Sequence, residues 1–375
     1  MGNGNDNEDR SDRSLLNLNY ILSLKLVRKI RCRYADLIEA RSAGCNKVEY
    51  KTATDLIRFL YSGASQTGSA HINVMKKVLV LCGGFSKERD ISMVTGRACT
   101  AALKDAGYDA YIIDVDRTLP EKLRQINPDV CFNALHGPYG EDGSVQGLLN
   151  IMGIPYTHSG VGASSIAMDK IKTKAIACQH GIHIAEDQLI DYATYKSMEI
   201  PFPYVLKPVN DGSSIATYIF NTSDAEKLSE QAWIYNTHAM MERYIKGREL
   251  TVTVFMNNPV TVTEIIPSTD HQFYNFHAKY DTGGSLHSLP ADIPDKAFNI
   301  CMENALAMHI LLGCRGISRS DFILEENTGN IFFLEINTQP GMTPTSLVPE
   351  QLAWAGISFT QLVSLLVDEA TIDVL

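Results

Sequence analysis

Polar and apolar residues alternate most regularly near the C-terminal end, where the pattern predicts two strands and a tight turn. The strands are expected at Asp321–Glu326 and Asn330–Asn337. Residues 327–329, Asn-Thr-Gly, suit a three-residue hairpin loop whose last position needs a positive φ. The pattern therefore predicts an antiparallel hairpin.

The register of this hairpin brings polar side chains together. With a three-residue loop, Asp321 lies opposite Glu335, and Asn337 shares a face with Glu335 because strand side chains repeat every second residue. Ile331 and Phe333 are expected on that same face, which puts the polar residues where a core should be. Carboxylate and amide oxygens suit Mg²⁺ that also binds substrate phosphates, and buried carboxylates need such a partner. An ordinary polar hairpin face is the alternative that the residues leave open.

The organised part of the chain is expected to begin at Met75 with an open α/β unit. Apolar runs predict strands at Val78–Cys82, Tyr111–Val115 and Val130–Ala134, with helical connections, the first of which ends near Ala106. In such sheets, ligands lie at the carboxyl ends of the strands.

Two loops begin at such strand ends. Residues 83–92, Gly-Gly-Phe-Ser-Lys-Glu-Arg-Asp-Ile-Ser, join a strand to a helix start and suit a small anionic or zwitterionic ligand, although a plain structural turn fits equally. Residues 136–143, His-Gly-Pro-Tyr-Gly-Glu-Asp-Gly, place His136 after another strand. A ligand role and a structural role for His136 both stay open.

Lysines near glycine and serine indicate a place for nucleotide phosphates. A helix start at residues 164–174 carries clustered lysines, and a strand at residues 203–208 ends in Lys207 and Pro. The donor-rich loop 210–214, Asn-Asp-Gly-Ser-Ser, precedes a strand at Ala216–Phe220. Such a loop can fold over phosphates as a lid, whereas a solvated hairpin is the structural alternative.

The remaining pattern predicts strands, one long loop and two helices. The loop at residues 273–280 is rich in aromatic residues and resembles an active-site cover. The other elements are strands at residues 240–245, 251–255 and 261–266, and helices at residues 295–312 and 347–369.

The first 74 residues differ from the rest of the chain. Residues 1–14 are expected to be disordered, residues 15–41 suit a basic amphipathic helix of a membrane-surface or transit segment, and residues 62–73 suit a flexible linker. Acidic residues at both ends fit a transit peptide poorly, and Asp6 stands where a myristoylation signal needs Ser or Thr. We expect this extension to be dispensable, or to reflect an over-long start assignment.

Composition narrows the class of protein. A chain of 375 residues suits two to three domains. Residues 1–75 carry 11 Lys/Arg against 8 Asp/Glu and the remainder 22 against 35, and this acidic body argues against nucleic acid as a partner. No apolar run is long enough to span a bilayer. Eight scattered cysteines without a Cys-x-x-Cys pair favour reduced thiols in a cytosolic protein.

Seven short motifs follow one another from residue 83 onward. They are the two loops quoted above, then Ser-Ile-Ala-Met-Asp-Lys, Leu-Lys-Pro with Gly-Ser-Ser, His-Ala-Lys-Tyr, Ser-Arg-Ser-Asp, and Glu-Ile-Asn-Thr-Gln-Pro-Gly-Met-Thr. Each motif is weak alone, but in series they resemble D-alanine–D-alanine ligases, ATP-grasp enzymes of cell-wall precursor synthesis. The resemblance runs from about Met75 to Glu369.

The resemblance implies an α/β (α+β) protein with the three-domain ATP-grasp architecture. Its expected parts are an N-terminal extension (1–74), an open parallel α/β substrate domain (75–158), a central ATP-grasp domain (159–242) and a C-terminal ATP-grasp domain with the metal site (243–375). ATP is expected between the last two domains. The resemblance also implies a cytoplasmic homodimer whose partners are D-alanine and ATP, with neither nucleic acid nor membrane.

The implied reaction joins two D-alanines through an acyl phosphate, which the amine of the second D-alanine attacks. The resemblance assigns each group of residues a role: two Mg²⁺ or Mn²⁺ ions to Asp321, Glu335 and Asn337; ATP phosphates to Lys170, Lys207 and Lys279; adenosine to Glu242, Ile245 and Glu249; the first D-alanine to Glu88 and His136; the second to Ser346 and Leu347; and the oxyanion to Arg319 and the Gly341 backbone N–H.

Tyr280 completes the implied site. Hydrogen-bonded with Ser213 and Glu88, it would handle protons, but a phenol with a pKa of about 10 needs help to act as a base. We therefore expect Tyr280 to be an organiser first and a base second, within a lid that excludes water. The departures from the family pattern are Phe85, Ala216 and Gln339, and none removes a functional group from the chemistry.

Other functions compete with this one. A D-alanine–D-lactate ligase is the nearest, and the Lys-Tyr pair that ends in Tyr280 argues against it. A different ATP-grasp ligase fits the Glu88 loop and the Ser346–Leu347 segment less well. A catalytically inactive nucleotide-binding module would normally lack a metal ligand or a lysine, and a binding protein for small amino acids would not need the metal hairpin.

Overall fold

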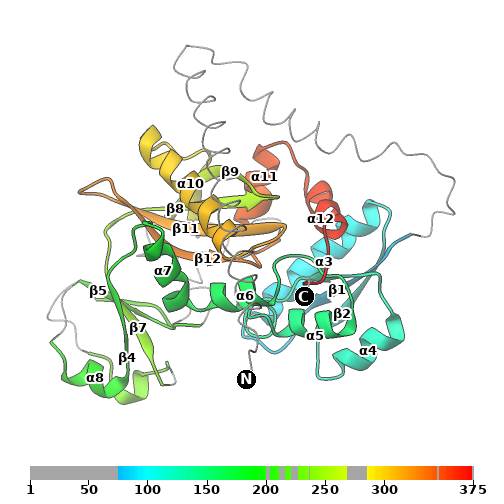
Figure 1. Cartoon of the computed structure of the whole chain (residues 1–375), viewed down its shortest axis with the longest axis horizontal. Helices are drawn as coiled ribbons and strands as arrows, with labels where there is room; N and C mark the ends of the chain where they lie inside the picture. Colours follow the sequence, from blue (N-terminus) through cyan, green and yellow to red (C-terminus); the bar gives the residue numbers. More distant parts are fainter. Residues whose placement is uncertain are drawn as a thin grey trace, which may run out of the picture. The chain divides into compact units, whose positions relative to one another are not determined.

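Three β-sheets organise the part of the chain that the computed structural model describes (Figure 1). This part comprises residues 75–199, 203–210, 216–220, 227–235, 237–267, 285–343 and 346–373. It belongs to one compact unit that spans Asn73–Leu375. One sheet is parallel and two are antiparallel, which confirms the mixed α/β class.

The parallel sheet has the strand order β2-β1-β3 and confirms the open α/β unit. Its central strand forms because Val78–Cys82 is an unbroken apolar run, and all five side chains are fully buried. Since β1 and β3 are parallel neighbours, the loops after Cys82 and Asn133 begin at the same edge. The elements are β1 (Lys77–Cys82), α3 (Arg89–Asp105), β2 (Asp109–Asp114), α4 (Leu119–Ile126), β3 (Val130–Asn133) and α5 (Ser144–Met152).

The helix start predicted at residues 164–174 is confirmed and divides into two helices. Asp169 separates them, because its side chain accepts the backbone N–H of Lys172 at 3.1 Å and so caps the second helix. The elements are α6 (Val161–Met168) and α7 (Lys170–Gln179).

An antiparallel sheet with the order β4-β7-β5-β6 follows α7. The strands predicted at residues 203–208, 216–220 and 240–245 are confirmed as β5, β6 and β7. One face of this sheet buries Tyr204 and Leu206 in a core of its own. The elements are β4 (Asp187–Ile190), α8 (Tyr192–Ser197), β5 (Tyr204–Lys207), β6 (Tyr218–Phe220), a 3-10 helix (Glu230–Ala232) and β7 (Ala239–Arg243).

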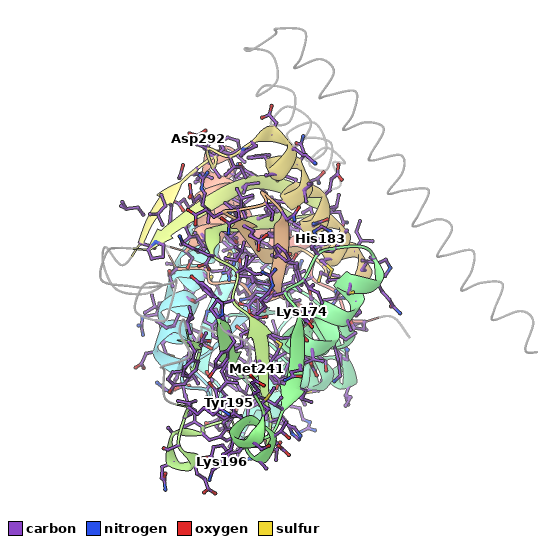
Figure 2. All side chains as sticks on the ribbon, turned by 90° about the vertical axis from the view of Figure 1, so that its left-hand side faces the viewer. Lys174, His183, Tyr195, Lys196, Met241 and Asp292 are labelled. Atoms are coloured by element: carbon purple, nitrogen blue, oxygen red, sulfur yellow. The ribbon has the colours of Figure 1, made fainter. Side chains whose placement is uncertain are left out.

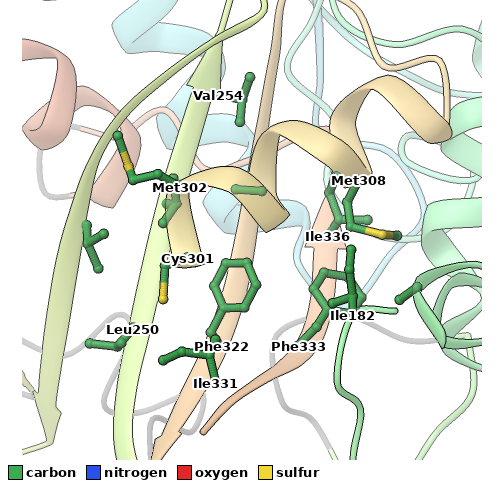
Figure 3. Packing of buried hydrophobic residues seen from close by; sticks show 14 of the residues in the cluster. Ile182, Leu250, Val254, Cys301, Met302, Met308, Phe322, Ile331, Phe333 and Ile336 are labelled. Atoms are coloured by element: carbon green, nitrogen blue, oxygen red, sulfur yellow. The ribbon is translucent and has the colours of Figure 1, made fainter. Parts of the chain in front are cut away.

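A five-stranded antiparallel sheet with the order β10-β9-β8-β11-β12 forms the last layer. Helix α10 covers one face, where Cys301 and Met302 pack with Leu250 and Phe322 (Figure 3). This apolar cluster anchors the strands that carry the predicted metal ligands. The elements are β8 (Gly247–Phe255), β9 (Asn258–Pro267), β10 (Ser285–Ser288), α10 (Asp295–Leu311), β11 (Ile317–Glu325) and β12 (Ile331–Asn337).

The predicted hairpin of β11 and β12 is confirmed, but its details differ. Asp321 pairs with Glu335 as expected, whereas Leu324 pairs with Ile331, because the turn is one residue longer than predicted. A β-bulge beside Phe322 adds one residue to β12 and restores the expected register. Gly329 has a φ of 67°, and the predicted positive sign is therefore confirmed.

The bulge also corrects the prediction that the apolar and polar residues of β12 share a face. Ile331 and Phe333 lie in the apolar core that packs against α10. Because the extra residue reverses the alternation, Glu335 and Asn337 point to the opposite face of the sheet, paired with Asp321 and Arg319. The two ligand candidates therefore do not occupy core positions.

The single helix predicted at residues 347–369 is wrong, because two helices occupy this range. Gly356, with a φ of 84°, ends the first helix in a left-handed conformation. Ser358 then begins the second with a capping box, in which Ser358 and Gln361 bond each other's backbone N–H groups. The elements are α11 (Leu347–Trp354) and α12 (Phe359–Asp368).

The segment after α12 returns to the parallel-sheet region. The side chain of Asp373 accepts hydrogen bonds from the Val161 backbone N–H at 3.0 Å and from Asn150 Nδ2 at 2.9 Å. Asn150 Oδ1 in turn accepts the Asp373 backbone N–H at 2.9 Å. Arg315 pairs with Asp373 at 3.2 Å. These contacts join α5, α6 and the start of β11.

Several predictions fall outside the described residues, among them the amphipathic helix, the linker and the loop at residues 273–280. The boundaries at residues 158 and 242 stay predictions. The six cysteines in the described part are free thiols. A search of the same residues finds no helix with the length and apolar character needed to cross a membrane.

Candidate active site

One face of the five-stranded sheet, here called the site face, carries a row of polar side chains. It is the face turned away from α10. Strand pairing places Thr251 of β8, Asp321 of β11 and Glu335 of β12 side by side. Arg319 and Asn337 form the neighbouring pair. The register alone thus collects the predicted metal ligands on one surface.

Asp321 is held in one orientation by two neighbours. Arg319 donates from Nε to Oδ1 at 2.9 Å and from Nη2 to Oδ2 at 2.8 Å. Thr251 donates its hydroxyl to Oδ1 at 2.6 Å. Such a bidentate pair fixes both the position and the plane of the carboxylate.

The other two ligand candidates are also positioned by hydrogen bonds or ion pairs. Lys170 Nζ, at the start of α7, lies 3.2 Å from Glu335 Oε2. Asn337 Oδ1 accepts the backbone N–H of Gln339 at 2.8 Å. The Asn337 amide oxygen has a second lone pair that can accept from another partner.

The chemistry of this donor set fits a divalent metal that is shared with a phosphate. Two carboxylates and one amide oxygen are hard ligands, and they are too few for a closed cage. In the described part of the chain, no cluster of three or more His, Cys, Asp or Glu side chains is arranged to hold a metal. The set therefore suits Mg²⁺ or Mn²⁺ that takes its remaining ligands from substrate or water.

Helix α7 reaches a second charged cluster one turn beyond Lys170. Lys174 is 1% exposed, and its ammonium lies 2.5 Å from Glu242 Oε2 and 3.0 Å from Asp187 Oδ2. Lys207 Nζ lies 2.5 Å from Glu242 Oε1. Figure 2 labels Lys174 on α7 and Met241, the neighbour of Glu242 on β7. Each oxygen of the Glu242 carboxylate thus meets one lysine.

The two lysines are not equivalent. Burial alone would raise the pKa of Glu242, but Lys207 and Lys174 outweigh it and hold that pKa below its usual range. Burial lowers the pKa of Lys207, and Glu242 offsets this only in part. Burial also acts to lower the pKa of Lys174, yet Glu242 and Asp187 reverse the effect and raise it. Lys174, which meets two carboxylates, is therefore the permanent cation of the cluster, whereas Lys207 meets only the Glu242 carboxylate.

Two predicted adenosine contacts lie close to these clusters. Glu249 pairs with Ile323 of β11 and so shares the site face with Asp321, two residues further along. Ile245 is 6% exposed and packs with Phe332. The structure thus brings both residues to the region between the four-stranded sheet and the hairpin.

The predicted site for the first substrate is compact. Glu88 is the N-cap residue of α3 and is 5% exposed. Ser86 ties this loop to the next, because its hydroxyl donates to the His136 carbonyl at 2.6 Å. His136 Nδ1 lies 3.2 Å from Glu141 and Nε2 lies 3.1 Å from the Thr95 hydroxyl. His136 is thus fixed by the protein, and a substrate carboxylate would share its ring with these partners.

The remaining predicted residues surround the N-terminus of α11. Ser346 precedes this helix, and its Oγ lies 2.7 Å from Thr343 Oγ1 and accepts the Thr343 backbone N–H at 3.0 Å. A Cβ at Gly341 would lie 2.9 Å from Ser346 Oγ, so only glycine fits without a shift. Leu347 is buried against Ile265.

Three predicted residues, Ser213, Lys279 and Tyr280, lie outside the described residues. Two residues that contact the site were missed from sequence. Lys174 had a signal, since it lies four positions after Lys170 on the same helix face. Thr251 had none, because its contact with Asp321 depends on a strand pairing 70 positions apart in sequence.

Comparison with known proteins gives consistent matches. Residues 118–159 match the family model described as D-ala D-ala ligase N-terminus, and residues 181–368 match D-ala D-ala ligase C-terminus. The D-alanine–D-alanine ligase of Agrobacterium fabrum is 46% identical over 304 residues, covering 79% of this chain and 98% of that protein. The D-alanine–D-alanine ligase of Ruegeria pomeroyi is 48% identical over 300 residues, covering 79% and 97%.

Solved structures agree. A crystal structure of D-alanine–D-alanine ligase from Bacillus anthracis matches with a TM-score of 0.67 and 29% identity, covering 78% of this chain and 97% of that one. The same enzyme complexed with ATP matches with a TM-score of 0.64 and 27% identity over the same shares.

Proposed function

This chain belongs to the D-alanine–D-alanine ligase family, and on that premise we propose that it joins two D-alanines, using ATP, to form D-alanyl-D-alanine for peptidoglycan synthesis. The observation that carries the proposal is the junction at α7. There Lys170 meets Glu335 on the site face, and Lys174 meets Glu242 one turn later. A phosphate-binding helix and a metal-binding hairpin side by side suit phosphoryl transfer.

In the first step, the carboxylate of one D-alanine attacks the γ-phosphorus of ATP, the bond to the β,γ-bridging oxygen breaks, and an acyl phosphate and ADP are formed. Glu88 binds the ammonium of this D-alanine, and His136 lies near its carboxylate. Lys170 and Lys207 turn from Glu335 and Glu242 to the phosphates, as the two carboxylates keep other partners.

Asp321, Glu335 and Asn337 would hold two Mg²⁺ (or Mn²⁺) ions, which when bound neutralise charge on the phosphates. Glu242, Ile245 and Glu249 contact the adenosine. Glu242 lies on β7, Ile245 just after β7 and Glu249 on β8, and these positions support the role because both strands border the lysine cluster.

In the second step, the amine of the other D-alanine attacks the acyl phosphate, and inorganic phosphate leaves. Ser346 and Leu347 hold the carboxylate of this D-alanine. Arg319 and the Gly341 backbone N–H stabilise the oxyanion, and Arg319 is already oriented by Asp321. Tyr280, Ser213 and Lys279 complete the site in the proposal.

The proposal extends to the setting of the enzyme. We place the enzyme in the cytoplasm, where its substrates are small soluble molecules. We expect it to be a homodimer. Within each chain, we expect domain boundaries at residues 158 and 242. Light scattering of the purified full chain tests the dimer.

The activity is tested by incubating the full-length chain with ATP, Mg²⁺ and D-alanine, and by measuring phosphate release and the dipeptide. Parallel reactions contain L-alanine, or D-alanine with D-lactate. We expect D-alanyl-D-alanine only where D-alanine is present, and loss of turnover in Asp321→Asn. A depsipeptide as the main product with D-lactate would contradict the proposal, as would ATP binding without turnover on D-alanine.

A further inference from the structure

A buried pair of amide side chains, Asn133 and Gln339, connects two parts of the site that lie 206 positions apart in sequence. Asn133 is the last residue of β3 and is fully buried, and Gln339 follows β12 and is 2% exposed. Asn133 Nδ2 donates to Gln339 Oε1 at 3.1 Å. Gln339 Nε2 donates back to the Asn133 carbonyl in a short hydrogen bond.

Each member of the pair also holds a piece of the site. Asn133 Nδ2 donates to the Gly140 carbonyl at 2.9 Å, within the loop that carries His136. Gln339 donates its backbone N–H to Oδ1 of Asn337 at 2.8 Å. A continuous hydrogen-bonded path thus runs from the His136 loop to a proposed metal ligand.

Hydrogen bonds restrict the orientation of the side chains along this path. The other groups of Asn133 are occupied as well, since its backbone N–H donates to Thr157 Oγ1 at 3.0 Å and its Oδ1 accepts the Leu135 N–H at 3.2 Å. A buried amide that loses its partner carries the full cost of desolvation, so the pair resists separation. Fully satisfied buried polar networks hold one geometry.

We propose that Asn133 and Gln339 are positioning residues that set the distance between the carboxylate of the first D-alanine and the γ-phosphate of ATP. This inference rests on the proposed function, because the His136 loop would hold that carboxylate and Asn337 would hold the metal at the phosphates. Phosphoryl transfer depends on this alignment, and small displacements of reacting groups cost large factors in rate.

The test compares Gln339→Met and Gln339→Glu with the wild-type full-length chain. Methionine fills the same space without hydrogen bonds, and glutamate accepts from Asn133 Nδ2 but cannot donate to the Asn133 carbonyl. Steady-state kinetics give kcat and the KM values for ATP and D-alanine. We expect kcat to fall about 10- to 100-fold in both variants, with the KM for ATP within about twofold of wild type, since no ATP contact is removed.

Asn150→Ala is the matched control. Asn150 makes a similar reciprocal pair with Asp373, outside the proposed site, with hydrogen bonds of 2.9 Å in each direction. We expect it to lower the melting temperature but to keep kcat. If a Gln339 variant does not fold, Gln339→Asn keeps the amide and draws it back by one methylene, and the same fall in kcat is expected.

The outcomes separate the inference from the function. A Gln339→Met variant that only melts earlier, with kcat unchanged, overturns the positioning role while dipeptide synthesis by the wild type stands. A rise in the KM for ATP with constant kcat also overturns it. If the wild type makes no dipeptide, the proposed function fails and the inference falls with it. A further check is Asn133→Ala together with Gln339→Met, which should be no slower than the slower single variant if the pair acts as a unit.

Discussion

Two charged clusters at neighbouring turns of α7 differ in how completely the protein compensates them. In the cluster of Lys174, Glu242 and Lys207, the side chains are 1%, 5% and 11% exposed, and both carboxylate oxygens meet a lysine. In the pair of Lys170 and Glu335 on the site face, the lysine is 11% exposed and the carboxylate 28%.

This difference shows how one helix can serve both stability and chemistry. Removing a buried charge from its partner is costly, so we expect Lys174, Glu242 and Asp187 to keep their ion pairs when Lys207 turns to a phosphate. A partly exposed pair contributes little, so Lys170 and Glu335 can exchange each other for a phosphate and a metal at small cost. The ion pairs of Lys174 are therefore the frame, and the partly exposed pair, together with Lys207, is the exchangeable part.

The strongest way to break this comparison is to remove the permanent cation. Lys174→Met leaves two buried oxygens, Glu242 Oε2 and Asp187 Oδ2, without their lysine, and we expect the free energy of unfolding to fall by about 3–5 kcal/mol. Urea denaturation at neutral pH measures it. Lys246→Met, in the exposed pair with Glu326, is the matched control and should cause no measurable change. A loss below about 1 kcal/mol for Lys174→Met would mean that the cluster is not the frame.

Glu335→Gln tests the exchangeable pair. Because the pair is partly exposed, we expect the free energy of unfolding to change by at most about 1 kcal/mol. Dipeptide formation should nevertheless fall about 100-fold, with a higher Mg²⁺ concentration needed for half-maximal rate, since a charged metal ligand becomes neutral.

Glu326→Gln, at the turn of the same hairpin, serves as the control for Glu335→Gln and should leave both quantities unchanged. Equal losses of activity in the two variants would show that any change in the hairpin disturbs the site. The loss in Glu335→Gln would then not report on a metal ligand.

The buried side chain of His309 sharpens the comparison further. His309 is 1% exposed, its Nδ1 lies 2.7 Å from the Ser318 hydroxyl, and burial lowers its pKa to about 4. Between pH 6.5 and pH 4 the unfolded chain takes up a proton that the native protein does not, so stability is present above pH 6.5 and is lost on acidification. Wild type should lose more stability than His309→Asn, by a difference that approaches about 1.4 kcal/mol per pH unit.

Urea denaturation at pH 6.5 and pH 5 measures this difference. His309→Asn keeps a polar group near Ser318 but removes the titrating ring. Parallel loss of stability in the two proteins would show that His309 does not contribute to acid sensitivity.

The hairpin shows what the sequence could and could not predict. The predicted pairing of Asp321 with Glu335 is confirmed, but the predicted three-residue turn is wrong: the turn is one residue longer, and the bulge offsets this difference. The bulge beside Phe322 was missed, because alternation alone does not say which face of a strand becomes buried. Only the packing of Ile331 and Phe333 against α10 decides that.

Elsewhere the missing information was of two kinds. The break between α11 and α12 has a local signal, Gly356 followed by Ser358 and Gln361, which here outweighs the continuous apolar pattern. The pairing of Asn133 with Gln339 had no local signal, since it depends on the tertiary fold. The roles given to Glu88, His136, Ser346 and the residues of the lid came from the family resemblance, and they stay predictions.

The β-bulge determines which surface receives the polar side chains of β12. With unbroken alternation, Glu335 and Asn337 would lie on the same face as Ile331 and Phe333, against α10. Because the bulge accommodates one extra residue, the two polar side chains lie on the opposite face, while the apolar half of the hairpin stays in the core. A local irregularity of the backbone thus lets one short strand supply both a hydrophobic core and a row of ligand candidates.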